Sequence, residues 1–227
     1  MCALHRADQG FYLIPNSRYL YGATHSCCKS FVLTYACSTI QVRSQTVEME
    51  NFLFVTHSRH KVAEAERVLG RRLMHHRLDL PELQSVDVEE VAIHKVKYAH
   101  EVLKRPVMVD DTGLYIDAWR GLPGALVKWF VQRVGDEGLC EMMQCFSVRS
   151  ARAKTVVATY DGTLHTFVGT VEGVIAQVPT GWNGYSWETV FIPDTSDRTY
   201  AEMSRDEKER HSMRRKALEE MLRYYGR

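Results

Sequence analysis

The chain has 227 residues, of which 45% are hydrophobic and 25% are charged, and its formal net charge is +1. This composition excludes a disordered chain and a nucleic-acid binder that depends on bulk basicity. No apolar run approaches the roughly 20 residues of a membrane span, so we expect no membrane partner. The low net charge likewise leads us to expect no nucleic acid as partner. Six cysteines without CxxC or zinc-binding spacing indicate free thiols in a reducing compartment, which predicts a cytoplasmic location.

Residues 1–48 differ from the rest of the chain. They contain four of the six cysteines and only two acids, Asp8 and Glu48. We predict an N-terminal extension outside the fold and a single domain over residues 49–227. The alternative is an organellar transit peptide, because such segments are rich in Arg and Ser and poor in acids.

The first predicted strand covers residues 51–56, and a polar turn leads from it into a helix that stops at Gly70. The apolar face of this helix comprises Val62, Ala65 and Leu69. A strand, a turn and a helix start together offer backbone N–H groups to an anion. Lys61 in the first helical turn opposes the helix dipole, which a bound phosphate would explain; an exposed lysine is the alternative.

A second helix is predicted to begin at Asp87, with Ala92, Val96, Ala99 and Leu103 on its apolar face. Lys95 lies off this face. Before the helix, an extended segment over residues 78–82 leaves Glu82 on a loop just after a proline.

The most informative stretch covers residues 106–130. A short apolar strand, Val107 to Val109, is predicted to end in two adjacent acids, Asp110 and Asp111. A turn needs one such acid, and the second then experiences like-charge repulsion. A hard cation relieves this repulsion, and Mg²⁺ commonly binds one or two carboxylates together with substrate phosphates. We therefore predict a divalent metal here.

Helical segments are predicted over residues 125–134 and 136–146, the second with Leu139, Met142 and Met143 in the core. Strands follow over residues 154–160 and 164–177. Gly169 and Gly173 indicate bulges or bends in the second of these strands.

A loop dense in glycine and aromatic residues, 181–188, leads into a short strand over residues 189–192. Its aromatic side chains either fill the core or stack on a planar base. Ser204 and Glu207 then form a capping box for a basic segment that includes Lys208.

Together these stretches resemble the inosine triphosphate pyrophosphatase family of nucleoside-triphosphate pyrophosphohydrolases, from about Phe52 to Leu222. The most specific matches are VDDTGLYIDA followed by GLPG, the TYAEM segment, and the spacing from Lys208 to Arg214. The resemblance implies an α/β fold with a long, twisted mixed sheet flanked by helices, two lobes with a central cleft, and a homodimer. It also implies Mg²⁺-dependent hydrolysis of the α–β phosphoanhydride of ITP, dITP and XTP, with Mn²⁺ as a substitute metal.

The resemblance assigns roles by position. Glu82 and Asp111 match the catalytic acids, and both match metal ligands together with Asp110. The positions that match triphosphate contacts are Thr56, Ser58, Lys61, Lys95, Thr112 and Lys208. The positions that match the base-binding region are Tyr185, Trp187, Glu188, Ser212 and Arg214.

The chain departs from the family pattern at three places. His57 replaces a glycine of the phosphate loop, where the backbone could require a positive φ. Glu188 replaces an aspartate near the base, and Met213 replaces a histidine. We predict retained hydrolysis with altered base selectivity or weakened turnover. The alternative is a nucleotide-binding protein without catalysis.

Overall fold

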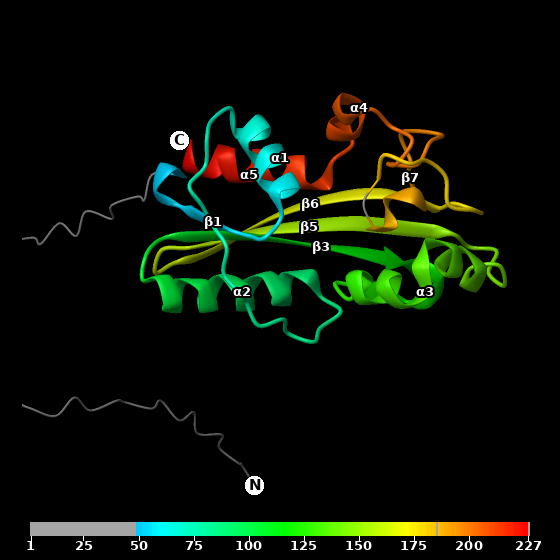
Figure 1. The fold of residues 1–227 in the computed structure, drawn as a ribbon, viewed down its shortest axis with the longest axis horizontal. Coiled ribbons are helices and arrows are strands. Elements are labelled where there is room, and N and C mark those ends of the chain that lie inside the picture. Colours follow the sequence, from blue (N-terminus) through cyan, green and yellow to red (C-terminus); the bar gives the residue numbers. More distant parts are fainter. Residues whose placement is uncertain (1–48, 185, 227) are drawn as a thin grey trace, which may run out of the picture. The chain divides into compact units, whose positions relative to one another are not determined.

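The computed structural model describes residues 49–184 and 186–226, so the expected N-terminal extension lies outside the described residues. The strands are β1 (Leu53–Val55), β2 (His75–His76), β3 (Val107–Ile116), β4 (Pro123–Gly124), β5 (Ser150–Tyr160), β6 (Leu164–Ile175) and β7 (Phe191–Pro193). In this part of the chain they form one seven-stranded sheet in the order β2-β1-β3-β5-β6-β7, with β4 paired to β3 (Figure 1). β1 is parallel to β2 and β3, and the other pairings are antiparallel. The predicted mixed sheet is confirmed.

Helices flank the sheet, as predicted. The helices are α1 (Arg59–Leu69), α2 (Val88–Leu103), α3 (Val127–Met142), α4 (Arg205–Arg210) and α5 (Met213–Tyr225), with short 3-10 turns η1 (Met49–Asn51), η2 (Asp117–Trp119) and η3 (Ser186–Thr189). α1 and α5 lie on one side of the sheet, and α2 and α3 lie on the other (Figure 1). Among the helices of the described residues, none is long and apolar enough to cross a bilayer.

Alternation along the strands divides the core between the two faces. Met108 and Phe54 pack with α1 and α5, whereas Val109 and Val55 pack with α2. Neighbouring residues of β3 therefore point to opposite faces, which decides where its acids lie.

The helix boundaries follow their predicted signals. α1 is capped by Ser58 and ends at Gly70, which adopts a left-handed φ of 67°. Asp87 caps α2 by accepting from the Glu89 N–H group. α3 is interrupted at Gly135, where φ is 72° and ψ is 175°, so it consists of two helical segments as predicted.

One core prediction in α3 was wrong. Leu139 and Met143 are fully buried, but Met142 is 44% exposed. Leu139 and Met143 are four residues apart, so they lie on the same face of the helix and point into the core. Met142 lies off this face and points into solvent.

The prediction that the strand ends at Val109 was also wrong. β3 continues to Ile116, and β5 pairs with it along its whole length, including Asp110 opposite Val157 and Asp111 opposite Val156. Aspartate disfavours strands, but strand propensity depends on context, and here the neighbouring strand overrides it. The two acids therefore lie inside a strand and not in a turn.

The glycines of β6 do not form the predicted bulges. The register between β5 and β6 is continuous through Gly169 and Gly173. A Cβ atom on Gly169 would lie 1.9 Å from the Met213 carbonyl oxygen. Glycine is required here because the backbone of α5 touches the strand.

Candidate functional site

The candidate site lies along one edge of β3. On that edge β1 pairs with Val107 and Met108, and β4 pairs with Leu114 and Tyr115. Among the described strands, none pairs with the edge of residues 109–113 between them. The backbone groups of this gap can therefore bind side chains, and the gap contains both acids of β3.

The turn between β1 and α1 lies beside this gap, because β1 runs parallel to β3. The Ser58 N–H group donates to the Thr56 hydroxyl at 3.1 Å, and the Ser58 hydroxyl accepts from the Lys61 N–H group. The Lys61 ammonium donates to the Asp110 carbonyl oxygen at 3.1 Å. The turn is thus built by three residues that were predicted to contact phosphate, and one of them binds the open edge of β3.

His57 joins this turn to the loop that carries Glu82. Its Nε2 atom lies 3.1 Å from the Leu78 carbonyl oxygen and 3.1 Å from an Asp79 carboxylate oxygen. Among the described residues other than glycine, positive φ values occur at Lys104, Arg120 and Ser186. His57 therefore replaces the usual glycine without a strained backbone.

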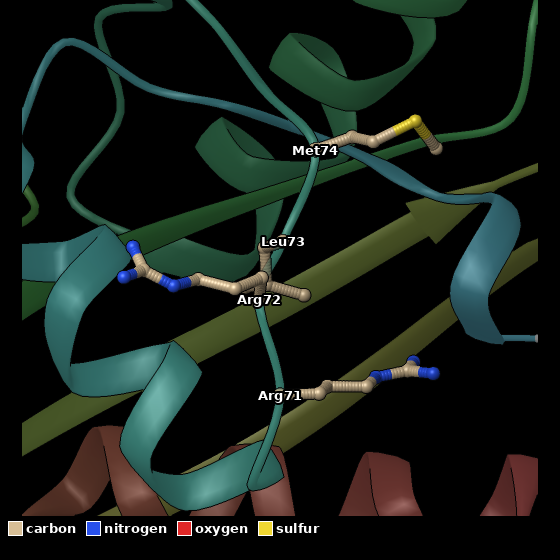
Figure 2. Close-up of a pocket in the computed structure, with 4 residues that line it drawn as sticks. All are labelled: Arg71, Arg72, Leu73 and Met74. Carbon is tan, nitrogen blue, oxygen red and sulfur yellow. The ribbon is translucent and has the colours of Figure 1, made fainter.

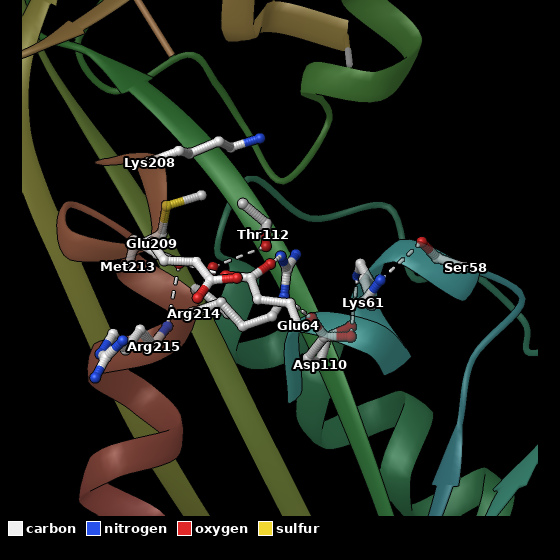
Figure 3. A network of polar contacts seen from close by, with 12 residues as sticks. Ser58, Lys61, Glu64, Asp110, Thr112, Lys208, Glu209, Met213, Arg214 and Arg215 are labelled. Carbon is white, nitrogen blue, oxygen red and sulfur yellow. Dashed lines mark hydrogen bonds and ion pairs between the residues drawn. The ribbon is translucent and has the colours of Figure 1, made fainter. Parts of the chain in front are cut away.

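Asp110 points toward α1 and α5 and lies in a buried ionic network (Figure 3). Its side chain is 1% exposed, with Lys61 Nζ 3.1 Å from one carboxylate oxygen and Arg214 Nε 2.7 Å from the other. Arg214 also donates from Nη1 to Glu64 on α1. The Ser212 hydroxyl donates to the other Glu64 oxygen at 2.5 Å. The network joins β3, α1 and the start of α5.

The electrostatics keep this network ionised. Burial alone would raise the pKa of Asp110, but Lys61 and Arg214 outweigh it and hold the pKa below its ordinary value. Burial likewise opposes ionisation of Glu64, and Arg214 and Ser212 outweigh it, so the Glu64 pKa is also lowered. Burial would lower the pKa of Arg214, and the two carboxylates instead raise it.

Asp111 points to the opposite face, toward α2. Its carboxylate accepts from the Lys95 ammonium at 2.6 Å, and the same ammonium lies 3.4 Å from a Glu82 oxygen. Burial would lower the pKa of Lys95, but Asp111 and Glu82 raise it above its ordinary value. Two acids from separate segments therefore converge on one cation.

This arrangement fits a divalent metal at Glu82 and Asp111. Among the residues that the structure describes, no three His, Cys, Asp or Glu side chains converge as a complete metal-binding group. Mg²⁺ does not need such a group, because it commonly takes one or two carboxylates and completes its shell with water and substrate phosphates. Asp110 points away from this pair and is neutralised by Lys61 and Arg214. We therefore leave Asp110 out of the proposed metal ligands.

Lys208 forms a third group. On α4, it donates to Glu188, a predicted base-binding residue, and its ammonium lies 5.9 Å from the centre of the Tyr200 ring. Lys208 also contributes to the lowered pKa of Glu64. The three predicted triphosphate lysines are thus each paired with an acid. The predicted cleft that would unite the three groups remains a prediction.

The base-binding residues have different environments. Trp187 is only 6% exposed and packs edge-on against Phe191, so its ring is part of the core. Ser212 caps α5, and its hydroxyl is used within the network described above. Tyr185 lies outside the described residues. The burial of Trp187 favours the packing alternative for that side chain.

Thr112 is the remaining predicted site residue on β3. Its hydroxyl hydrogen-bonds the Thr155 hydroxyl on β5 at 2.8 Å, and its N–H group donates to the Asp111 carboxylate at 3.0 Å. The second bond fixes the orientation of the acid.

A hollow of about 270 Å³ lies elsewhere, after α1 (Figure 2). Its lining residues are Arg71, Arg72, Leu73 and Met74. It contains none of the predicted site residues, so we do not assign the nucleotide to it.

Glu64 was not predicted as a site residue from the sequence. This acid lies on α1 and contacts both Arg214 and Ser212. The available signal was its spacing, because a residue three positions after Lys61 lies on the same helix face. An acid on a helix surface is so common that the spacing alone did not single it out.

Comparison with known proteins identifies the family of the chain. The sequence model of the Ham1 family matches residues 52–224. The inosine triphosphate pyrophosphatase of Schizosaccharomyces pombe is 39% identical over 165 residues, covering 70% of this chain and 87% of the relative. The dITP/XTP pyrophosphatase of Thermococcus kodakarensis is 38% identical over 170 residues, covering 74% and 92%. The structure of the Staphylococcus aureus Ham1 protein superposes with a TM-score of 0.66 at 25% identity, covering 77% of this chain and 97% of that one. The chain belongs to the Ham1 family.

Proposed function

We propose that this protein hydrolyses the α–β phosphoanhydride of ITP, dITP and XTP, which yields the monophosphate and pyrophosphate. Relatives that are named inosine triphosphate pyrophosphatase and dITP/XTP pyrophosphatase are 39% and 38% identical to it. The observation that carries the proposal is the convergence of Glu82 and Asp111 on the ammonium of Lys95. Two acids beside a cation supply the charges that metal-assisted phosphate chemistry requires.

Glu82 and Asp111 are the residues that would hold Mg²⁺, or Mn²⁺ in its place. A bound divalent ion offsets phosphate charge and polarises the scissile phosphate. Asp111 is suited to bind the ion or to accept a proton from the attacking water, and both roles require an ionised carboxylate. The Thr112 N–H bond and the Lys95 ammonium orient this carboxylate.

The triphosphate would be bound by Lys61, Lys95 and Lys208. Each ammonium contacts a carboxylate in the structure. A polyphosphate brings several negative charges and replaces or joins these carboxylates as partner. The hydroxyls of Thr56 and Ser58, in the turn before Lys61, and of Thr112, next to Asp111 on β3, would supply neutral hydrogen bonds.

The base would be read by Glu188, Ser212 and Arg214. A guanidinium has five N–H donors, and the contacts with Asp110 and Glu64 use Nε and Nη1. A remaining donor suits the 6-keto oxygen of hypoxanthine or xanthine and opposes the 6-amino group of adenine. An unpaired buried donor costs about 1–3 kcal/mol, which disfavours ATP. Tyr185 would stack on the base, and Trp187 would support it from the core.

Two further properties are proposed: a homodimer, from the family resemblance, and a cytoplasmic location, from the cysteines without disulfide or zinc-binding spacing. The alternative function is nucleotide binding with weak or absent turnover. The observation in its favour is the contact between Lys208 and Glu188, because this acid departs from the family pattern and occupies a proposed phosphate-binding lysine.

The test is pyrophosphate release from ITP, XTP, GTP, ATP and dUTP, with Mg²⁺ and after its removal by a chelator. We expect release from ITP and XTP that depends on the metal, and little release from ATP. A thermal-shift titration on the same samples detects binding. Binding without release from any nucleotide would replace the proposed hydrolase with the binding protein.

A further inference from the structure

One face of α1 carries three charged side chains of alternating sign. Lys61, Glu64 and Arg67 are spaced three residues apart, so they lie along the same side of the helix. Each contacts a group of opposite charge: Lys61 contacts Asp110, Glu64 contacts Arg214, and Arg67 contacts Glu209. The first two contacts belong to the buried ionic network around Asp110 in the candidate site. The third has no role in the proposed reaction.

The third contact joins α1 to α4, the helix that carries Lys208. Arg67 donates from Nε to one Glu209 carboxylate oxygen, and its Nη2 atom forms an ion pair with the same oxygen. The Glu209 side chain is 16% exposed, which is low for an acid on a six-residue helix. Figure 3 shows Lys208 and Glu209 adjacent on α4, beside the residues of α1 and α5.

Packing alone does not fix α4. None of its residues is buried. Polar contacts hold it instead: Ser204 caps its start, Glu207 pairs with Arg198, Lys208 with Glu188, and Glu209 with Arg67. A short helix without a buried face opens readily when such contacts are lost.

We propose that Arg67 and Glu209 are positioning residues that hold Lys208 at a fixed spacing from Lys61. This inference rests on the proposed function, in which both lysines bind one triphosphate. Lys61 and Arg67 lie on one rigid helix, six residues or about 9 Å apart along its axis. The Arg67–Glu209 pair therefore ties the second lysine to the helix that carries the first. Neither Arg67 nor Glu209 is among the proposed nucleotide contacts.

The kinetic test compares Arg67→Gln and Glu209→Gln with a matched control, Glu219→Gln. The control removes the same charge as Glu209→Gln, but from an exposed pair within α5, between Arg215 and Glu219. We expect either positioning variant to raise KM for ITP roughly threefold to fivefold, the range that a partly exposed ion pair supports. kcat and the melting temperature should change little. The exchanged pair Arg67→Glu with Glu209→Arg should restore KM.

A background without Lys208 separates positioning from a general structural role. In Lys208→Gln the ammonium that Arg67 would position is absent. The double variant Lys208→Gln with Arg67→Gln should therefore have the same KM as Lys208→Gln alone. If the two substitutions instead multiply their effects on KM, or if Arg67→Gln alone leaves KM as in the wild type, the inference is overturned.

A second readout does not depend on activity. We expect amide hydrogen exchange in residues 204–210 of the nucleotide-free protein to be faster in Arg67→Gln than in the wild type or Glu219→Gln. Unchanged exchange there would overturn the inference whatever the kinetics show. A wild-type protein that releases no pyrophosphate would overturn the proposed function, and the exchange data would still decide whether Arg67 fixes α4.

Discussion

Replacing Asp110 by Asn tests the buried ionic network most directly. The Asp110 side chain is 1% exposed and is contacted by Lys61 and Arg214. The substitution keeps the shape but leaves two cations facing a neutral amide. Breaking a buried pair costs about 3–5 kcal/mol. Because Arg214 keeps Glu64 and the Lys61 side chain is 25% exposed, we expect a value near the lower end.

The pH dependence gives this prediction a second observable. Asp110 and Glu64 have pKa values held below their ordinary values of 3.8 and 4.5. A lowered folded-state pKa contributes stability that is complete above the ordinary pKa and is lost as the pH falls through the folded-state value. Each such group adds a slope of up to about 1.4 kcal/mol per pH unit in that window. Within the ionic network, the wild type has two of these groups and Asp110→Asn has one.

The assay is urea unfolding between pH 7 and pH 3, followed by circular dichroism. The control is Asp117→Asn, which removes an acid that is 45% exposed and 3.7 Å from Arg152. The control should lose less than about 1 kcal/mol. If Asp110→Asn is as stable as the control, or shows the wild-type slope below pH 4, the network does not contribute as we have reasoned.

Three further predictions concern packing and backbone strain, and each is measured by urea or thermal unfolding. Gly169→Ala should destabilise the fold by about 3 kcal/mol or more, because its Cβ atom would lie 1.9 Å from the Met213 carbonyl oxygen of α5. Gly162→Ala is the comparison: its Cβ atom would meet nothing within 4 Å, so this variant should cost less even though Gly162, unlike Gly169, has a positive φ. Ser186→Gly should stabilise by about 0.5–1 kcal/mol, because Ser186 has a φ of 62° that disfavours a Cβ atom; a gain from Ser186→Ala would contradict this reason. Trp187→Ala should cost about 3–5 kcal/mol as a core truncation, whereas Trp182→Ala, at a side chain that is 91% exposed, should stay within about 0.5 kcal/mol. Equal effects of the two Trp substitutions would show that Trp187 is not a packing residue.

Local sequence signals predicted the helices and strands that have clear start and stop residues. The apolar run over residues 51–56 gave the strand β1, Gly70 ended α1, and Asp87 capped α2. Gly135 separated the two helical segments that the pattern predicted. These features depend on neighbours within a few residues, so the sequence carries them directly.

The features that the sequence did not predict depend on partners far along the chain. β3 continues through two aspartates because β5 pairs with it more than 40 residues later. Gly169 is required by the approach of α5, and not by the shape of its own strand. Glu64 gains its role from Arg214, which is 150 residues away. No local pattern encodes such contacts.

The candidate site was predicted in composition but not in arrangement. Asp110 and Asp111 were expected to share one cation, yet adjacent strand residues point to opposite faces. Lys61 and Arg214 neutralise the first acid, and Lys95 joins the second to Glu82. The strand period would have predicted this separation if the strand had been extended by two residues.

The most direct test of the account is pyrophosphate release from ITP by the wild type and by Asp111→Asn, with Mg²⁺ present. We predict that the wild type releases pyrophosphate and that Asp111→Asn loses turnover while ITP still raises its melting temperature. Undiminished release by Asp111→Asn would contradict the central claim that this carboxylate, together with Glu82, forms the reacting centre.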